Sequence, residues 1–379
     1  MSSIPKPLQK ALQEREAAGT LRRLSQESYP IDFYSNDYIG LAKSTAVREK
    51  AHAILQSYPV QNGSTGSRLL SGNYPLIREA ETYLAAFHAG ERGLLFNSGY
   101  DANVGIFSSI PQKGDVVLYD QYIHASIRDG LQLNKAQNFK FKHNSLSDLQ
   151  EKLQRFATTA TTLYIATEAV FSMDGDTPDL LAMVALAKQY NAYIIIDEAH
   201  SVGVFGQKGE GLCQALGIEK DIFLRLITFG KGIGAHGALV LAQVEVIDYL
   251  VNFARSFIYT TATAPESVAT LLAAYALLPE TKERALLHEN ITFFREKAQV
   301  LSQEKGLTFI DSTSAIQGLI IPDSQRVKQV AAHLQAQGMG IKPILSPTVP
   351  KGEERLRICL HSYNTKEEIT QLFQGISKE

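Results

Sequence analysis

The 379-residue chain has no tryptophan and only two cysteines, Cys213 and Cys359, which lie far apart. Two cysteines in a chain of this length cannot form a disulfide framework, so we expect reduced thiols and a cytoplasmic protein. No segment approaches the roughly 18 consecutive apolar residues of a membrane span. Residues 1–16 carry charges without an apolar centre, which argues against a secretory signal.

The chain also has no strong excess of either charge. It holds 37 lysines and arginines against 39 aspartates and glutamates, a formal net charge of -2, so no basic field for nucleic acid is predicted. With 45% hydrophobic and 20% charged residues the composition is that of a globular protein. Its length allows one large domain and a smaller one.

Short apolar segments alternate with helix-like segments from residue 93 onward. We expect strands at 93–96, 115–120, 163–167, 193–197 and 223–228. Between them we expect helices at 99–110, 124–134, 146–156 and 178–190. This alternation predicts an α/β domain with a mostly parallel sheet, and the unbroken apolar strands predict a sheet covered on both faces.

The two ends of the chain do not continue this alternation of strands and helices. Residues 6–24 predict an amphipathic helix, and residues 265–304 a long helical region. After it, strands are expected at 307–311, 315–321, 340–344 and 356–360, with helices near 325–337 and 365–377. We therefore predict an N-terminal helix and arm (1–45), a large α/β domain (46–280) and a small C-terminal α+β domain (281–379).

Lys231 stands where an apolar run, 226–229, breaks into alternating glycines. Its small neighbours leave room around the lysine, and the strand end fixes its position. Both features suit an amine that must react with a bulky aldehyde. Upstream, Asp197 ends a strand of apolar residues, where an unpaired carboxylate would be costly. A protonated pyridine nitrogen is a good partner for such a carboxylate. Together the two residues suggest pyridoxal 5'-phosphate (PLP).

Other polar residues follow neighbouring strands, and ligands of open parallel sheets bind beyond the strands' carboxyl ends. Ser98, Gly99 and Tyr100 open a helix, whose N–H groups favour a phosphate, although a plain helix cap is the commoner meaning. His124 could stack on a planar ring and move protons. Taken singly, His124 is more often a surface residue, and Ser172 a turn residue.

The sequence of residues 197–200, Asp-Glu-Ala-His, also matches the motif of nucleic-acid helicases. That reading requires a phosphate loop of the form GxxxxGK[ST] upstream. The glycine-containing segment 63–68 lacks the lysine. We therefore rank the helicase interpretation last.

Together these motifs resemble those of the α-oxoamine synthases, PLP-dependent enzymes of fold type I. The resemblance runs from Ser35-Asn36-Asp37-Tyr38 to Arg355-Leu356-Arg357, nearly the whole chain. Between these ends, the matching motifs occur in the same order at residues 66–72, 98–103, 124–126, 171–176, 197–203, 228–231 and 257–261. It implies an aminotransferase-like large domain with a mostly parallel sheet and a smaller α+β C-terminal domain.

The resemblance also implies a role for each matching residue. Lys231 would bind PLP covalently, Asp197 would pair with the ring nitrogen, and His124 would lie on the ring face. Catalysis would involve these three residues and His200, without a metal. Cofactor binding would further involve Ser98, Gly99, Tyr100, Ser172, His200 and Thr228, with Thr260 and Thr261 from the second subunit of a homodimer. Asn36 and Arg357 would hold the amino-acid carboxylate, and Arg22 and Thr348 would bound the acyl-thioester side.

Within the family, segments 253–259, 314–317 and 347–350 are most similar to the branch that serves biotin synthesis. That branch condenses L-alanine with a pimeloyl thioester of coenzyme A or acyl carrier protein. Relatives that use glycine or serine, 2-amino-3-ketobutyrate ligase and serine palmitoyltransferase, share most motifs and remain alternatives. So does a non-catalytic PLP-binding protein. His236 departs from the pattern, which has a small residue there.

Overall fold

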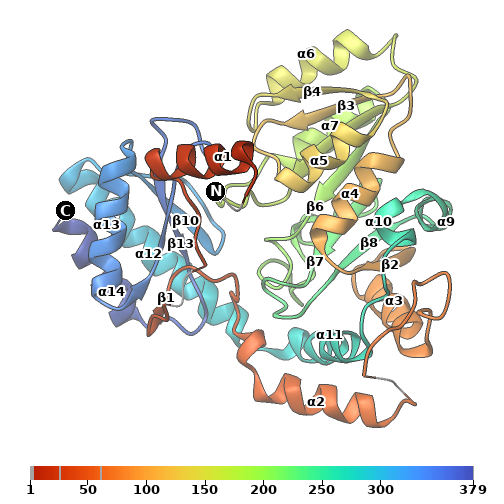
Figure 1. Ribbon diagram of the computed structural model, residues 1–379, viewed down its shortest axis with the longest axis horizontal. Helices are drawn as coiled ribbons and strands as arrows, with labels where there is room; N and C mark the ends of the chain where they lie inside the picture. Colours follow the sequence, from red (N-terminus) through yellow and green to blue (C-terminus); the bar gives the residue numbers. More distant parts are fainter. Residues whose placement is uncertain (1–3, 25–26, 60–61, 379) are drawn as a thin grey trace.

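A seven-stranded sheet forms the centre of the larger part of the protein (Figure 1). The computed structural model describes residues 4–24, 27–59 and 62–378. The strand order is β2-β8-β7-β6-β5-β3-β4, and only β8 runs antiparallel to its neighbours, which confirms the mostly parallel sheet. The strands are β2 (Arg92–Phe96), β3 (Val116–Asp120), β4 (Gln137–Phe141), β5 (Leu163–Glu168), β6 (Ala192–Asp197), β7 (Leu224–Thr228) and β8 (Ala238–Ala242).

Helices cover both faces of this sheet, as its buried apolar strands require. One apolar cluster joins the sheet to α4, α5, α9 and α10, a second joins it to α6, α7 and α8, and a third to α2, α3 and α11. Their bounds are α2 (Thr45–Gln56), α3 (Pro75–Phe87), α4 (Gly99–Ser109), α5 (Ala125–Leu133), α6 (Leu146–Phe156), α7 (Leu180–Gln189), α8 (Leu212–Ala215), α9 (Val244–Phe253), α10 (Arg255–Ile258) and α11 (Pro265–Leu277).

The C-terminal part is a smaller α+β unit, as predicted. Its sheet has the order β12-β13-β10-β9 and is antiparallel. The N-terminal strand β1 (Ile31–Asp32) pairs with β11, so the start of the chain joins this unit. The elements are α12 (Glu283–Lys305), β9 (Thr308–Phe309), β10 (Ile316–Ile320), α13 (Ser324–Ala336), β11 (Met339–Gly340), β12 (Lys342–Ile344), β13 (Arg355–Cys359) and α14 (Lys366–Ser377). The domain boundaries at residues 45 and 280 stay predictions.

The structure differs from the expected elements in several places. Strands β4 and β8 were missed: β4 is an edge strand with polar residues on it, and β8 continues the glycine-rich run after Lys231. The helical region after Pro265 is interrupted by the 3₁₀ turns η2 (Leu278–Glu280), where a proline ends α11. A further 3₁₀ turn, η1 (Leu41–Lys43), precedes α2.

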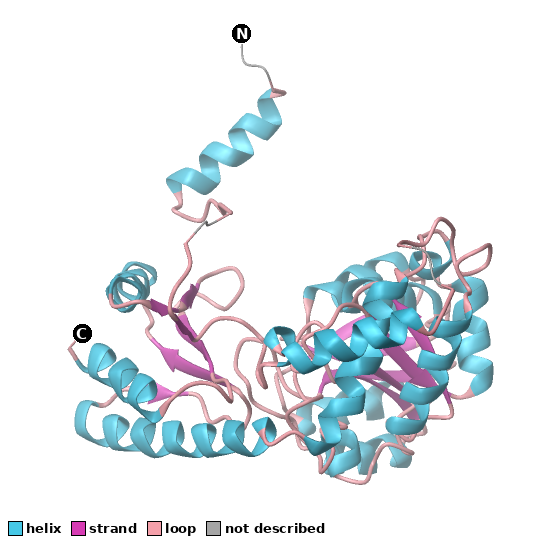
Figure 2. Cartoon of the chain, turned by 90° about the horizontal axis from the view of Figure 1, so that it is seen from below, coloured by secondary structure: helices cyan, strands magenta, loops and turns pink. Residues whose placement is uncertain are grey.

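The predicted amphipathic helix at 6–24 is shorter than expected. Helix α1 (Lys6–Ala17) ends before Gly19, whose φ of 62° is left-handed and stops the helix. It buries no residue, and it projects from the rest of the protein (Figure 2). Among the described residues, no helix combines the length and apolar character that crossing a bilayer requires.

A buried ion pair lies directly behind the end of β6. Arg225 on β7 donates from Nε to Glu198 Oε1 at 2.8 Å, and both side chains are at most 3% exposed. Glu198 Oε2 also accepts from the Cys213 backbone and the Ser201 hydroxyl, each at 3.0 Å. Burial alone would raise the pKa of Glu198, but Arg225 and these donors hold it below its usual value. The pair therefore joins β6 to β7 next to Asp197.

We predict that Arg225→Met destabilises the protein by about 3–5 kcal/mol, because it leaves the Glu198 carboxylate buried without its cation. The matched control is Arg295→Met, which removes an ion pair whose side chains are 44% and 91% exposed and should cost about 0–1 kcal/mol. Urea unfolding of both variants measures the difference. Equal stability of the two variants would contradict the importance of the buried pair.

Candidate active site

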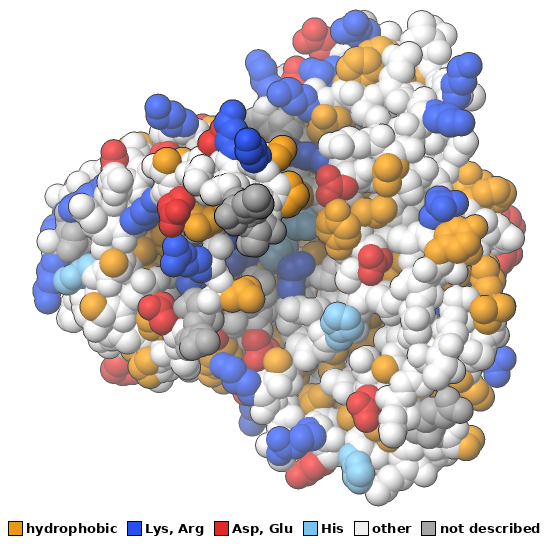
Figure 3. All heavy atoms as spheres, viewed as in Figure 1, with side chains coloured by type: hydrophobic (Ala, Val, Ile, Leu, Met, Phe, Trp, Pro, Cys, Tyr) orange, Lys and Arg blue, Asp and Glu red, His pale blue; other side chains and the backbone are white. Residues whose placement is uncertain are grey.

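A cavity of about 200 Å³ opens beyond the carboxyl ends of the central strands. Figure 3 shows this face hollowed between the two halves of the molecule. The structure brings most predicted site residues together here, although they come from strand ends and loops throughout the larger part. The lining is Asn36, Ser98, Gly99, Tyr100, Asn103, His124, Ser126, Glu168, Asp197, Ala199, His200, Thr228, Gly230, Lys231, His236 and Gly237.

Lys231 lies in the turn that connects β7 to the antiparallel β8. Its Nζ donates to Thr228 Oγ1, the last residue of β7, at 3.4 Å. Burial lowers the pKa of Lys231, although the carboxylates of Asp197 and Glu168 oppose the shift. Lys231 therefore loses its proton more readily than a surface lysine does. The uncharged amine is the form that acts as a nucleophile or a base.

Asp197 is 6% exposed and both of its carboxylate oxygens are held. Oδ1 accepts from the Ala199 backbone and Oδ2 from Asn103 Nδ2, each at 2.9 Å. Asn103 Nδ2 also donates to Ser126 Oγ at 3.0 Å, and this hydroxyl lies 2.8 Å from His124 Nδ1. A continuous hydrogen-bonded chain thus fixes the carboxylate relative to the imidazole.

Glu168 is a second acid in the cavity, and sequence reasoning did not select it. It is 3% exposed, it ends β5, and it stands beside Asp197 in the β5–β6 register. Its Oε1 accepts from the His124 backbone N–H at 2.7 Å. Burial, reinforced by the Asp197 charge, raises the pKa of Glu168 well above its usual value and so favours the protonated acid.

His200 is part of a second chain of contacts, which leads to the C-terminal unit. The hydroxyl of the fully buried Tyr38 lies 2.7 Å from His200 Nδ1 and donates to Asn36 Oδ1 at 3.1 Å. Asn36 Oδ1 also accepts from Arg357 Nη2 at 3.0 Å, and Arg357 Nε donates to the Ser172 carbonyl at 2.6 Å. Burial, with the nearby Lys231 charge, lowers the pKa of His200 well below its usual value, so the ring is neutral.

The start of α4 forms one end of the cavity. Ser98 caps the helix by accepting from the Asp101 N–H at 3.0 Å. A Cβ on Gly99 would lie 2.5 Å from Thr228 Cγ2, so only glycine allows this close approach of helix and strand. The helix start offers backbone N–H groups that have no partner within the helix, which suits an anion.

Thr260 and Thr261 do not line the cavity of their own chain. The side-chain amide of Asn97, beside Ser98, donates to Thr260 Oγ1 at 3.1 Å and to the Thr261 carbonyl at 2.8 Å. The two threonines therefore lie near the phosphate-suited end without reaching it. Their predicted role across a subunit interface stays a prediction.

A second pocket of about 350 Å³ adjoins the first and shares His124 with it. It contains the two residues predicted for the acyl side, Arg22 and Thr348, and the predicted cofactor residue Ser172. The rest of its lining is Tyr122, Ile123, Ala125, Arg128, Phe171, Met173, Asp174, Pro347, Val349 and Pro350. Most of these side chains are apolar or aromatic, which suits an acyl chain. We call this the acyl pocket.

The residues of the cavity fit PLP. The cavity is lined by the buried carboxylate of Asp197, by the Lys231 amine of lowered pKa and by the start of α4. Because Gly99 has no side chain, the helix start packs closely against Thr228. Sequence reasoning missed Glu168, Asn103, Ser126 and Tyr38 as site residues. Only the position of Asn103, one helical turn after Gly99, carried a usable signal, because residues four apart share a helix face. His236, which departs from the family pattern, lies exposed on the rim.

We predict that Gly99→Ala weakens PLP binding about 5- to 150-fold, because the added methyl group overpacks against Thr228 at a typical cost of about 1–3 kcal/mol. Gly63→Ala is the control, since a Cβ there meets nothing within 4 Å. Equilibrium titration of both apo proteins with PLP, followed by visible absorbance, gives the two dissociation constants. An unchanged constant for Gly99→Ala would show that the close approach is unimportant.

Comparisons with known proteins agree with the geometry. Residues 29–376 match the family model of aminotransferase class I and II. An 8-amino-7-oxononanoate synthase of Emericella nidulans is 42% identical over 98% of this chain and 94% of its own. The solved 8-amino-7-oxononanoate synthase of Francisella tularensis is 30% identical, with a TM-score of 0.78 over 92% of this chain and 97% of that one. Serine palmitoyltransferase of S. paucimobilis, solved with PLP and myriocin bound, is 27% identical, with a TM-score of 0.88 over 98% of this chain and 96% of that one. The chain therefore belongs to the aminotransferase class I and II family, within the α-oxoamine synthases, and its cofactor is PLP.

Proposed function

We propose that the protein is a PLP-dependent acyltransferase that condenses L-alanine with a pimeloyl thioester. The products are 8-amino-7-oxononanoate, carbon dioxide and the free thiol, in a step of biotin synthesis. The observation that carries the proposal is the convergence of Lys231 and Asp197 on one cavity beside the separate acyl pocket. Relatives named 8-amino-7-oxononanoate synthase, 36–42% identical, support alanine as the amino acid.

The cofactor, when bound, supplies an electron sink for the α-carbon of the amino acid. The chain's own residues do the rest. Lys231 would tether the cofactor, and its freed amine would take the α-proton. The held carboxylate of Asp197 would pair with the ring nitrogen and favour its protonated form, and His124 would lie against the ring. His200 and Ser172 would contact the ring hydroxyl, although Ser172 lines the acyl pocket and not the cofactor cavity.

The remaining predicted residues bind and orient the substrates. Ser98, Gly99, Tyr100 and Thr228 would hold the phosphate at the start of α4. Arg357 and Asn36, already in contact at 3.0 Å, would receive the amino-acid carboxylate. Arg22 and Thr348 would bound the thioester in the acyl pocket. We place the enzyme in the cytoplasm, where its two buried thiols, Cys213 and Cys359, stay reduced.

The proposed function is tested by incubating the protein with PLP, L-alanine and pimeloyl-CoA and identifying the product by mass. We expect 8-amino-7-oxononanoate from the wild type. Lys231→Ala should lose more than the roughly 10²- to 10⁴-fold due to proton transfer alone, because the tether is lost as well. Parallel reactions with glycine and serine test the alternatives. Preferential turnover of either amino acid, or substantial turnover by Lys231→Ala, would refute the proposal.

We also propose that the active enzyme is a homodimer with the active site at the subunit interface. Segments 66–72 and 259–262 lie against each other, since the Ala262 N–H donates to the Gly66 carbonyl at 3.0 Å. They expose Leu70 and Tyr259, 82% and 71% accessible. Such exposed apolar side chains favour a protein interface. Thr260 and Thr261, within the second segment, are hydrogen-bonded to Asn97, next to the cavity end at Ser98.

We predict that dissociation of this dimer releases PLP, because Thr260 and Thr261 of one subunit would complete the phosphate site of the other. Dilution of the holoenzyme, followed by mass photometry and by cofactor fluorescence, measures the two events. They should occur over the same concentration range. A monomer that keeps its cofactor would contradict the shared site.

A further inference from the structure

The acyl pocket lies between the two halves of the protein. Tyr122, after β3, and Arg128, on α5, line it from the larger part, whereas Thr348 and Val349 belong to the C-terminal unit. The segment 171–176, which we call the seam loop, lies between them and contributes Phe171 to Asp174 to the lining. The width of the pocket therefore depends on what joins the seam loop to each half.

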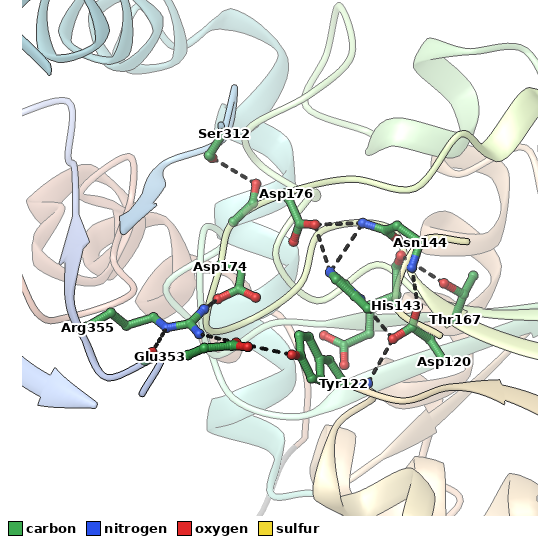
Figure 4. A network of polar contacts seen from close by, with 12 residues as sticks. Asp120, Tyr122, His143, Asn144, Thr167, Asp174, Asp176, Ser312, Glu353 and Arg355 are labelled. Carbon is green, nitrogen blue, oxygen red and sulfur yellow. Dashed lines mark hydrogen bonds and ion pairs between the residues drawn. The ribbon is translucent and has the colours of Figure 1, made fainter. Parts of the chain in front are cut away.

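On the large-sheet side, the seam loop is held by His143. Its Nδ1 lies 2.9 Å from Asp120 Oδ1 and its Nε2 lies 2.8 Å from Asp176 Oδ2 (Figure 4). Burial by itself would lower the pKa of His143, but the two carboxylates raise it to about 9, so the ring is a cation at neutral pH. Asn144 Nδ2 adds a hydrogen bond to Asp176 Oδ2 at 2.6 Å. This end of the loop is thus fixed to β3.

His143, Asp174 and Asp176 bring ligand-type atoms within 4.8 Å of one another, as a metal site would. The partners of these atoms argue for an ion-pair network instead. Both ring nitrogens of His143 face carboxylates, and a protonated imidazole has no lone pair for a metal. Asp174 is paired with Arg355.

On the C-terminal side, the seam loop is held by Arg355 of β13. Its guanidinium forms a buried ion pair with Asp174; the two side chains are 3% and 9% exposed. Ser312 Oγ donates to the Gly175 carbonyl at 2.8 Å. Gly175 has a φ of 75°, and a Cβ there would lie 2.0 Å from the Ile316 carbonyl oxygen, so the loop is pressed against β10.

Glu353 connects the two sides of the acyl pocket directly, because it contacts both Arg355 and Tyr122. Arg355 Nη2 lies 3.4 Å from Glu353 Oε2, and the Tyr122 hydroxyl donates to the same oxygen at 3.3 Å. The Tyr122 ring lies against His143, with centroids 4.5 Å apart. Glu353 follows the pocket residues Thr348 and Val349 by a few positions. The polar contacts therefore run from β3 across the seam loop to β13 and back (Figure 4).

We propose that Asp174 and Arg355 are a positioning pair that sets the width of the acyl pocket and thereby controls binding of the acyl thioester. The proposal rests on the proposed function. Neither side chain lines the cofactor cavity. Arg355 lies two residues before Arg357, on the same face of β13, so one strand serves the two sites through different arginines. Arg357 Nε has its own hydrogen bond to the seam loop, at the Ser172 carbonyl, and this bond does not involve the pair, so the pair acts mainly on the acyl substrate.

The test compares the double variant Asp174→Asn/Arg355→Gln with the wild-type holoenzyme. Removing both charges leaves no buried charge unpaired, so the variant should fold, and thermal melting checks this. We expect the KM for the acyl thioester to rise at least tenfold. The dissociation constant for L-alanine, read from the visible spectrum, should stay within about twofold. A folded variant with unchanged acyl KM, or with alanine binding weakened as much, would overturn the proposal.

The matched control is Arg295→Gln, which breaks the exposed ion pair with Asp311 in the same unit and should change neither constant. A second readout does not depend on the substrate. Amide hydrogen exchange of residues 171–176 and 347–352 in the holo double variant should be at least tenfold faster than in the wild type. Unchanged exchange would also overturn the positioning role. If pimeloyl-CoA is not turned over at all, the proposed function fails, and the exchange measurement still decides the role of the pair.

Discussion

The site depends on one buried carboxylate at the end of a central strand. Asp197 is taken out of water by the sheet and two helical layers, and its charge is tolerated because Asn103 and the Ala199 N–H hold both oxygens. The same donors orient it. Because Asn103 also contacts Ser126, and through it His124, a single hydrogen-bonded chain aligns the acid with the imidazole on the other side of the cavity.

The parallel sheet explains why these residues meet. Strands β3, β5, β6 and β7 end at one edge, so residues separated by a hundred positions share one cavity. The antiparallel β8 adds a feature that a fully parallel sheet would lack. It lets the chain return directly after β7, in a turn of glycines that brings Lys231 back over the strand ends.

The sequence predicted β2, β3, β5, β6 and β7 and the helices α4 to α7 because their apolar patterns are local, and it predicted Lys231 and Asp197 because each interrupts an apolar pattern. It could not predict Glu168 as a site residue, since its importance comes from the β5–β6 register, which is a tertiary property. The same holds for Tyr38, which is brought to His200 by the pairing of the N-terminal segment with the C-terminal unit. Helix α1 was expected to be longer, because its apolar spacing continues to Leu21, past Gly19, whose left-handed φ ends the helix.

The pairing of Glu168 with Asp197 across the ladder links cofactor loading to protons. The protonated form of Glu168 is favoured because burial disfavours its anion and because the negatively charged Asp197 lies beside it. A cationic ring nitrogen at Asp197 would cancel that neighbour's charge and so lower the proton affinity of Glu168. Filling the cavity would then favour proton release from Glu168 at the end of β5, and the contribution of this residue to cofactor binding would increase with pH.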